Sequence, residues 1–184
     1  PYLTADGNRI YFASDMEGGQ GGLDIWYCDR IGEAWGKPVN LGKPVNTSGN
    51  EVFPSVDGYG DLFFASNVHP GYGGLDLFKT SQLNGKWAEP ENLRAPVNSP
   101  ADDFGICFAN DTMGYFSSDR AEGRGSDDIY QFVWLPPIMN ESGLEFAGIF
   151  QYDSLPASNV LLELLDNQDR VVGKIWTDKD GYFT

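Results

Sequence analysis

The chain has 184 residues, enough for one ordinary domain or for one domain and part of a second. Its 12 Lys and Arg against 27 Asp and Glu give a net charge of −15 without any basic run, which argues against nucleic acid and anionic membrane surfaces as partners. The 23 Gly, the 11 Pro and an aromatic content of 14% favour an all-β fold with many short turns over a disordered chain, and no apolar run approaches the ~18 residues of a membrane-spanning helix.

A repeat with a period of 52 residues organises the first part of the chain. The sequence YFASD at residues 11–15 returns as FFASN at 63–67 and as YFSSD at 115–119. Three further segments keep the same spacing. GGLDI at 21–25 returns as GGLDL at 73–77 and GSDDI at 125–129, WGKPVNL at 35–41 returns as WAEPENL at 87–93, and PVN at 44–46 returns at 96–98. A fixed period of this length indicates a repeat architecture of stacked units.

Each unit is predicted to form four strands, a to d, which in the middle unit lie at about 51–56, 61–66, 75–81 and 86–93. Strand b is apolar at the consecutive positions from Leu62 to Ala65, which is typical of a strand buried on both faces. A sheet between two other sheets gives this pattern, whereas the strands of a lectin-like sandwich would alternate. We therefore expect a partial β-propeller over residues 1–133, with blades at about 1–50, 51–102 and 103–133.

The third unit has strands a, b and c but then enters Leu135-Pro136-Pro137 without the segment that forms strand d in the other units. A last blade that lacks its outer strand is what ring closure by an N-terminal strand would leave. We therefore expect the chain to be the C-terminal half of a propeller from a longer protein. The alternative is that two half-propellers close on each other as a dimer.

Residues 134–143 are predicted to be a linker, because they are rich in proline and polar residues. Residues 144–184 then change to alternating strands, and about forty residues can hardly bury a core of their own. This part resembles the start of a carboxypeptidase-regulatory-like β-sandwich. The resemblance rests on Gly148-Ile149-Phe150, on Pro156, on the run from Val160 to Leu164 and on the run from Thr177 to Phe183.

The repeated residues are interpreted as scaffold rather than as a catalytic or metal site. Asp24, Asp76 and Asp128 should accept hydrogen bonds from backbone N–H groups of the Gly-rich b–c loops, and the spacing of these loops does not fit a calcium-binding nonapeptide. Asp15 and Asp119 are not expected to be catalytic, because the middle unit carries Asn67 at that position and an amide cannot act as a general base. The remaining repeat signature residues are Trp35, Trp87, Asn40 and Asn92.

No enzyme activity, cofactor or metal is predicted. His69 is the single histidine, no GxSxG sequence is present, and the histidine is expected to be an exposed loop residue. Cys28 and Cys107 are expected to be two buried free thiols.

Binding is expected where the units differ. In antiparallel blades the b–c and d–a loops emerge on one face, and variable loops on a rigid frame are a common recognition surface. The candidate binding residues in the b–c loops are Gln20, His69, Tyr72, Arg120 and Arg124. The d–a loops at about 43–50 and 95–102 would lie beside them.

The repeat resembles the TolB-type (WD40-like) propeller repeat, on the pattern YFASD, GGxDI, WxxPxNL and PVN quoted above. Together with the sandwich-like segment, it is similar to the PorE-like envelope lipoproteins of the OmpA family, which belong to the type IX secretion system. That resemblance implies a six-bladed propeller and a non-enzymatic scaffold, periplasmic and associated with the outer membrane. It also implies secretion-system or other envelope proteins as partners, and peptidoglycan bound by an OmpA-like domain outside these residues. Two alternatives are a propeller that gates a serine peptidase and a glycan-binding module that uses loop aromatics such as Tyr72.

Overall fold

A computed structural model describes residues 1–110, 112–121, 123–133, 138–140, 143–145, 148–152, 155–165 and 171–183. The chain divides into two compact units, Pro1–Trp134 and Leu135–Thr184. All regular structure in the described residues is β-strand, paired antiparallel, and these residues contain no helix. The prediction of an all-β protein is therefore confirmed.

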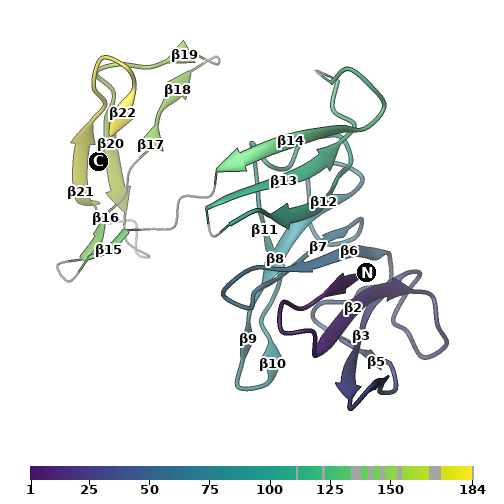
Figure 1. Cartoon of the computed structure of the whole chain (residues 1–184). Helices are drawn as coiled ribbons and strands as arrows, with labels where there is room; N and C mark the ends of the chain where they lie inside the picture. Colours follow the sequence, from purple (N-terminus) through teal and green to yellow (C-terminus); the bar gives the residue numbers. More distant parts are fainter. Residues whose placement is uncertain are drawn as a thin grey trace. The chain divides into compact units, whose positions relative to one another are not determined.

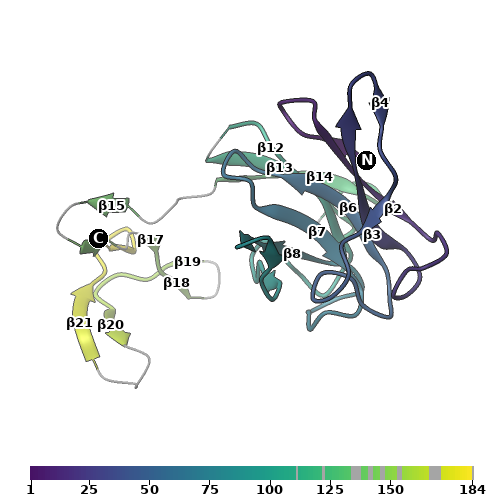
Figure 2. The same ribbon diagram turned by 90° about the horizontal axis from the view of Figure 1, so that it is seen from below.

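The first unit contains three antiparallel sheets that stack on one another in chain order (Figures 1 and 2). Sheet 1 has the order β1-β2-β3-β4 with β5 also paired to β3, sheet 2 has the order β11-β8-β7-β6, and sheet 3 has the order β12-β13-β14. A separate hairpin, β9–β10, extends from sheet 2. The strands of sheet 1 are β1 (Tyr2–Leu3), β2 (Arg9–Ser14), β3 (Asp24–Ile31), β4 (Ala34–Trp35) and β5 (Val39–Asn40). Those of sheet 2 and its hairpin are β6 (Glu51–Val56), β7 (Leu62–Ser66), β8 (Asp76–Thr80), β9 (Gln82–Leu83), β10 (Lys86–Trp87) and β11 (Glu91–Asn92). Those of sheet 3 are β12 (Asp103–Phe108), β13 (Met113–Ser118) and β14 (Asp128–Val133).

The strand register repeats with the sequence period. The last residue of strand b pairs with the first residue of strand c in every sheet, as Ser14–Asp24, Ser66–Asp76 and Ser118–Asp128. Strand a carries a bulge at one equivalent place in sheets 2 and 3, where Phe53 (φ 53°) and Gly105 (φ 66°) have left-handed backbones. The repeat seen in the sequence is thus a repeat of three-dimensional structure.

Sheet 2 lies between the other two sheets and supplies both halves of the core. All five residues of β7 are buried. Leu62 and Phe64 pack toward sheet 1 in a cluster with Ile25, whereas Phe63 packs toward sheet 3 in a second cluster with Phe116. Burial of such side chains stabilises by about 1.5–3 kcal/mol each. The prediction that strand b is buried on both faces is confirmed for this sheet.

The outer face of sheet 3 is more exposed than the faces inside the stack. Ile25 and Leu77 are 0% exposed, whereas Ile129, at the equivalent position of sheet 3, is 77% exposed. Strands β3 and β8 each pair with a strand d, but within the described residues β14 pairs only with β13. Among the described residues, sheet 3 therefore has three strands and no strand d.

One cysteine prediction is wrong. Cys28 is buried as expected, but Cys107 is exposed, and both are free thiols. Cys107 follows the bulge in β12, where the neighbouring Ile106 takes the inward position instead. The bulge cannot be recognised from the apolar sequence, and it turns the side chain of Cys107 outward.

In the second unit, the strands of the described residues form two-stranded pairs. They are β15 (Ile138–Asn140) with β16 (Gly143–Glu145), β17 (Gly148–Ile149) with β22 (Tyr182–Phe183), β18 (Gln151–Tyr152) with β19 (Leu155–Pro156), and β20 (Leu161–Leu165) with β21 (Val171–Trp176). Strand β15 lies inside the predicted linker, whose residues 134–137 and 141–142 fall outside the described part of the chain. Thr177 is buried and ties two segments together, since its Oγ1 donates to the Ala157 carbonyl at 2.7 Å and accepts from the Val160 N–H at 2.9 Å. The β-sandwich remains a prediction.

Candidate functional site

The repeated aspartates hold the b–c loops, which join β2 to β3, β7 to β8 and β13 to β14. Oδ2 of Asp76 accepts hydrogen bonds from the backbone N–H groups of Tyr72 at 2.9 Å and Gly73 at 3.0 Å. Asp24 and Asp128 accept from N–H groups at the corresponding loop positions. The interpretation of these carboxylates as acceptors for loop N–H groups is confirmed.

Repeated asparagines complete the edge of sheets 1 and 2 beside strand d. Oδ1 of Asn98 accepts from the Leu77 N–H at 2.8 Å, and its Nδ2 donates to the Leu77 carbonyl at 2.8 Å and to Oδ1 of Asn92 at 2.9 Å. Asn46 and Asn40 repeat this arrangement in sheet 1. Since Asn98 and Asn46 are buried, these amides replace strand partners that the short strand d does not supply. Of the repeated tryptophans, Trp87 packs against the core cluster between sheets 1 and 2, whereas Trp35 is exposed.

The b–c loops of sheets 2 and 3 are each joined directly to the d–a loop that precedes the sheet. Oδ1 of Asn67 accepts from the Asn50 N–H at 2.8 Å, and Oδ1 of Asp119 accepts from the Asp102 N–H at 2.7 Å. Asparagine and aspartate therefore serve as equivalent acceptors here, in agreement with the sequence comparison. A Cβ atom on Gly73 would lie 2.0 Å from a backbone oxygen of the next d–a loop, so the two loops approach too closely for a side chain. The two kinds of loop share one end of the strands, as predicted.

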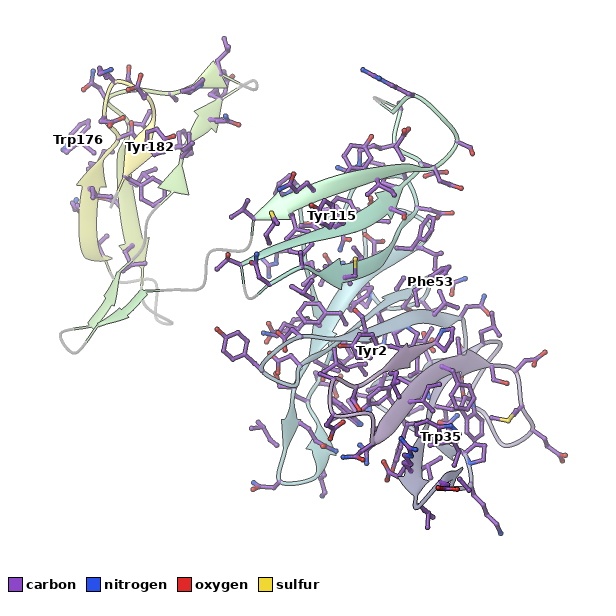
Figure 3. All side chains as sticks on the ribbon, viewed as in Figure 1. Tyr2, Trp35, Phe53, Tyr115, Trp176 and Tyr182 are labelled. Carbon is purple, nitrogen blue, oxygen red and sulfur yellow. The ribbon has the colours of Figure 1, made fainter. Side chains whose placement is uncertain are left out.

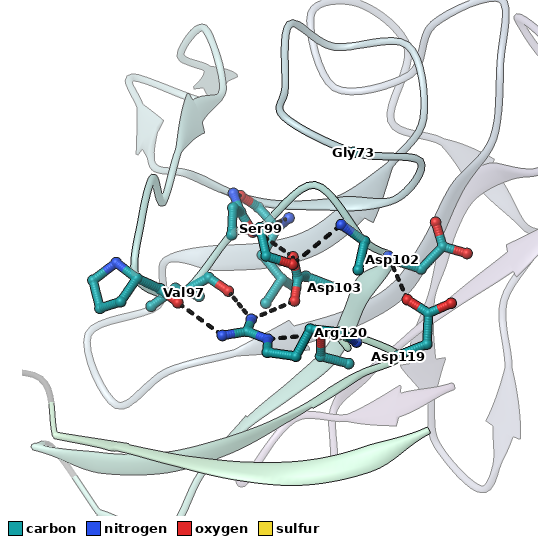
Figure 4. A network of polar contacts seen from close by, with 12 residues as sticks. Gly73, Val97, Ser99, Asp102, Asp103, Asp119 and Arg120 are labelled. Carbon is teal, nitrogen blue, oxygen red and sulfur yellow. Dashed lines mark hydrogen bonds and ion pairs between the residues drawn. The ribbon is translucent and has the colours of Figure 1, made fainter. Parts of the chain in front are cut away.

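Arg120 is part of this frame. Its Nη2 lies 2.6 Å from Oδ1 of Asp103, which is 0% exposed, and 2.7 Å from the carbonyl oxygen of Val97 (Figure 4). The guanidinium carbon also lies 5.1 Å from the ring centre of Phe116 and 4.7 Å from that of Tyr130. The side chain is therefore engaged within the fold, and its prediction as a binding residue is not favoured by this placement.

His69 has a similar position in sheet 2. Its Nε2 lies 2.9 Å from the carbonyl oxygen of Val45, the residue equivalent to Val97. The ring packs at 5.8 Å from Phe64 and 5.1 Å from Phe78, measured between ring centres. The expectation of an exposed loop histidine is wrong, because the ring is partly buried against the core.

The other three candidate residues form a set that the repeat itself defines. Gln20, Tyr72 and Arg124 stand at one equivalent position, 52 residues apart, and each donates its backbone N–H to the aspartate of its own loop. All three are exposed, with Tyr72 at 55%. The main chain is thus fixed at this position in every sheet, while the side chain changes from amide to phenol to guanidinium.

A cavity of about 590 Å³ lies at the opposite end of the strands, between the a–b turns of sheets 1 and 2. Arg9 stands in it and is held by Asp29, with Nε–Oδ1 at 2.6 Å and Nη2–Oδ2 at 3.0 Å. This hydrogen-bonded pair raises the pKa of Arg9 above its ordinary value, and the guanidinium lies 4.1 Å from the ring centre of Tyr27. The pair is therefore a fixed, charged wall of the cavity.

Tyr2, labelled in Figure 3, lines the cavity from the side of sheet 1 and bridges to sheet 2. Its hydroxyl donates to the Val56 carbonyl at 2.7 Å. Burial, and then the negative charge of Asp57, raise the pKa of Tyr2. Sequence reasoning missed this cavity, because it looked for binding residues only at the end of the strands that carries the b–c and d–a loops. The available signal was that Tyr2, Arg9 and Asp29 do not recur at the equivalent positions of the other units.

Two kinds of site are not found in the part of the chain that the structure describes. No three His, Cys, Asp or Glu side chains gather there as ligands for a metal ion. Among the same residues, no helix is long and apolar enough to cross a membrane.

The fold and the loops define an all-β repeat protein of stacked antiparallel sheets. No family model matches the chain, and no curated protein matches it significantly.

Proposed function

We propose that the chain is a non-enzymatic protein-interaction scaffold whose three sheets are consecutive blades of a β-propeller. Two observations support the propeller. Ile129 is exposed at a position that the next sheet covers in sheets 1 and 2, and β14 pairs with only one strand within the described residues. A further blade would cover Ile129, and a further strand would pair with the free edge of β14.

The observation that carries the scaffold proposal is the set Gln20, Tyr72 and Arg124. A loop frame fixed by repeated hydrogen bonds and bearing a different exposed side chain in each sheet is suited to recognition. Fixed main chains also lower the entropy lost on binding.

The cellular setting is proposed from the resemblance of the repeat to TolB-type propellers and PorE-like envelope lipoproteins. On that basis the protein acts in the periplasm near the outer membrane, as part of type IX secretion machinery. Its partners are other secretion or envelope proteins, and an OmpA-like domain of the parent protein holds peptidoglycan. The carboxypeptidase-regulatory-like sandwich belongs to the same proposal.

Site-specific photo-cross-linking in intact cells tests the proposal. A photoreactive phenylalanine at Tyr72 should capture envelope proteins, identified by mass spectrometry. The same group at Leu83, which is exposed on the β9–β10 hairpin, is the matched control and should capture few of them. Recovery of cytosolic proteins only would contradict the envelope assignment, and labelling of the full-length protein by a serine hydrolase probe would contradict the non-enzymatic one.

A further inference from the structure

The side chains that line the cavity between sheets 1 and 2 differ from those at the equivalent place between sheets 2 and 3. Val56 and Tyr11 line it, and their equivalents 52 residues later are Phe108 and Phe63. Those two rings pack together at 4.7 Å between centres, so that a phenylalanine lies between sheets 2 and 3 at the position where Val56 leaves space between sheets 1 and 2. The stacked sheets therefore accommodate either a valine or a phenylalanine at this position.

The size of the cavity fits a small-molecule ligand, since such pockets commonly hold about 300–1,000 Å³. Its rim includes Tyr59, whose side chain is 72% exposed and presents a flat apolar face. Tyr2 and the Arg9–Asp29 pair keep the opposite walls in place. The site is thus formed before any ligand arrives.

The polar groups offer both donors and acceptors. Oδ1 of Asp57 accepts from the N–H groups of Tyr59 at 2.9 Å and Asp61 at 3.0 Å, whereas Oδ2 accepts from no group in the described part of the chain. The Tyr11 hydroxyl accepts only a long bond from Arg9, at 3.4 Å, and its own O–H has no described acceptor. One free acceptor and one free donor therefore belong to the same cavity.

This donor and acceptor set selects among ligand classes. Three carboxylates (Asp6, Asp29 and Asp57) against one guanidinium disfavour an anion. An ammonium group has donors only and would leave the Tyr11 hydroxyl and the remaining Arg9 N–H groups unmatched. Hydroxyl groups both donate and accept, and a sugar ring also has an apolar C–H face that can lie on an aromatic ring.

We propose that this cavity binds a neutral saccharide unit, with one ring face on Tyr59 and its hydroxyl groups bonded to Asp57 and Tyr11. The site lies at the end of the strands opposite to Tyr72 and is separate from the interaction surface proposed above. Failure of one proposal leaves the other open to its own test.

The test is a titration of the 184-residue chain with a panel of neutral, amino and acidic mono- and oligosaccharides, followed by calorimetry or ligand-detected NMR. Neutral sugars should bind. Val56→Phe, which copies the Phe108 arrangement, should fill the cavity and weaken binding at least about tenfold, and Tyr59→Ala should weaken it about five- to tenfold. Tyr72→Ala, on the other loop face, should leave the affinity unchanged.

Circular dichroism and thermal unfolding of each variant separate loss of binding from loss of fold. If Val56→Phe does not fold, Asp57→Asn provides the second measurement, because it replaces the free carboxylate oxygen while keeping the size of the side chain. Absence of binding by every neutral sugar, binding of charged ligands only, or binding that Val56→Phe and Asp57→Asn leave intact would each overturn the proposal.

Discussion

Loss of the Arg120 side chain should destabilise the compact unit Pro1–Trp134 more than any substitution of an exposed loop residue. The Asp103 carboxylate is fully buried, and its Oδ1 has Arg120 as its partner at 2.6 Å, while Oδ2 accepts from the Ser99 N–H at 2.6 Å and from the Ser99 hydroxyl at 2.8 Å. Arg120→Leu would leave one oxygen of a buried carboxylate without a partner. Breaking a buried pair in this way costs about 3–5 kcal/mol. Because the Arg120 side chain is 16% exposed and water can reach it, we expect the low end, about 3 kcal/mol.

Urea unfolding followed by far-ultraviolet circular dichroism measures this loss. Arg124→Leu in the same loop is the matched control, since that side chain is exposed, and should change the free energy of unfolding by no more than about 0.5 kcal/mol. In the double variant Arg120→Leu, Asp103→Asn the buried charge is also gone, so we expect recovery of about 2 kcal/mol relative to additive losses. A loss below about 1 kcal/mol for Arg120→Leu, or additive losses in the double variant, would refute the view that this pair holds the loop frame.

Three further predictions concern the frame and the strand ends. Asn98→Asp should cost about 2–4 kcal/mol in urea unfolding, because it buries a carboxylate that can donate neither to the Leu77 carbonyl nor to Oδ1 of Asn92; a loss no larger than that of an exposed substitution would contradict the edge-completing role. Gly105→Ala should cost about 1–2 kcal/mol, since the left-handed backbone and not lack of space resists a side chain there; an unchanged thermal midpoint would contradict this. Burial raises the pKa of Asp61, but the hydrogen bond and the charge of Lys79 help to hold this pKa below its ordinary value. The charged carboxylate therefore stabilises the fold above about pH 4. Asp61→Asn should therefore be less stable at neutral pH, by under about 1 kcal/mol, and this difference should disappear as the pH falls through the lowered pKa.

The sequence alone was sufficient for features that depend on periodicity. The 52-residue period, the antiparallel sheets and the two-sided burial of Leu62 to Ala65 follow from apolar patterning and turn residues, which act locally. The equivalence of Asn67 and Asp119 was also accessible, because both side chains offer an acceptor at the same place.

Features that depend on contacts between repeats could not be predicted from the sequence pattern. His69 and Arg120 occupy neighbouring but non-equivalent positions of the repeat, yet both reach the carbonyl of the same d–a loop residue, Val45 or Val97. An alignment of the repeats therefore does not reveal that His69 and Arg120 make the same contact. The cavity arises from two turns about fifty residues apart and from the small side chain of Val56, whose effect depends on what lies opposite.

The two ends of the strands differ in how much the frame constrains them. At the end that carries the b–c and d–a loops, recurring aspartates, asparagines and glycines fix the main chain, so variation is confined to outward side chains such as Tyr72. At the opposite end, which carries the a–b turns, the first repeat has Arg9 and Asp29 where the second repeat has Asp61 and Ser81. The residues that form the walls of the cavity therefore differ from one repeat to the next. A surface for a protein partner suits the first end, because it keeps its shape while its side chains vary. A pocket for a small ligand suits the second, because its shape can vary without loss of the stack. The Val56→Phe and Tyr72 experiments address these two ends independently.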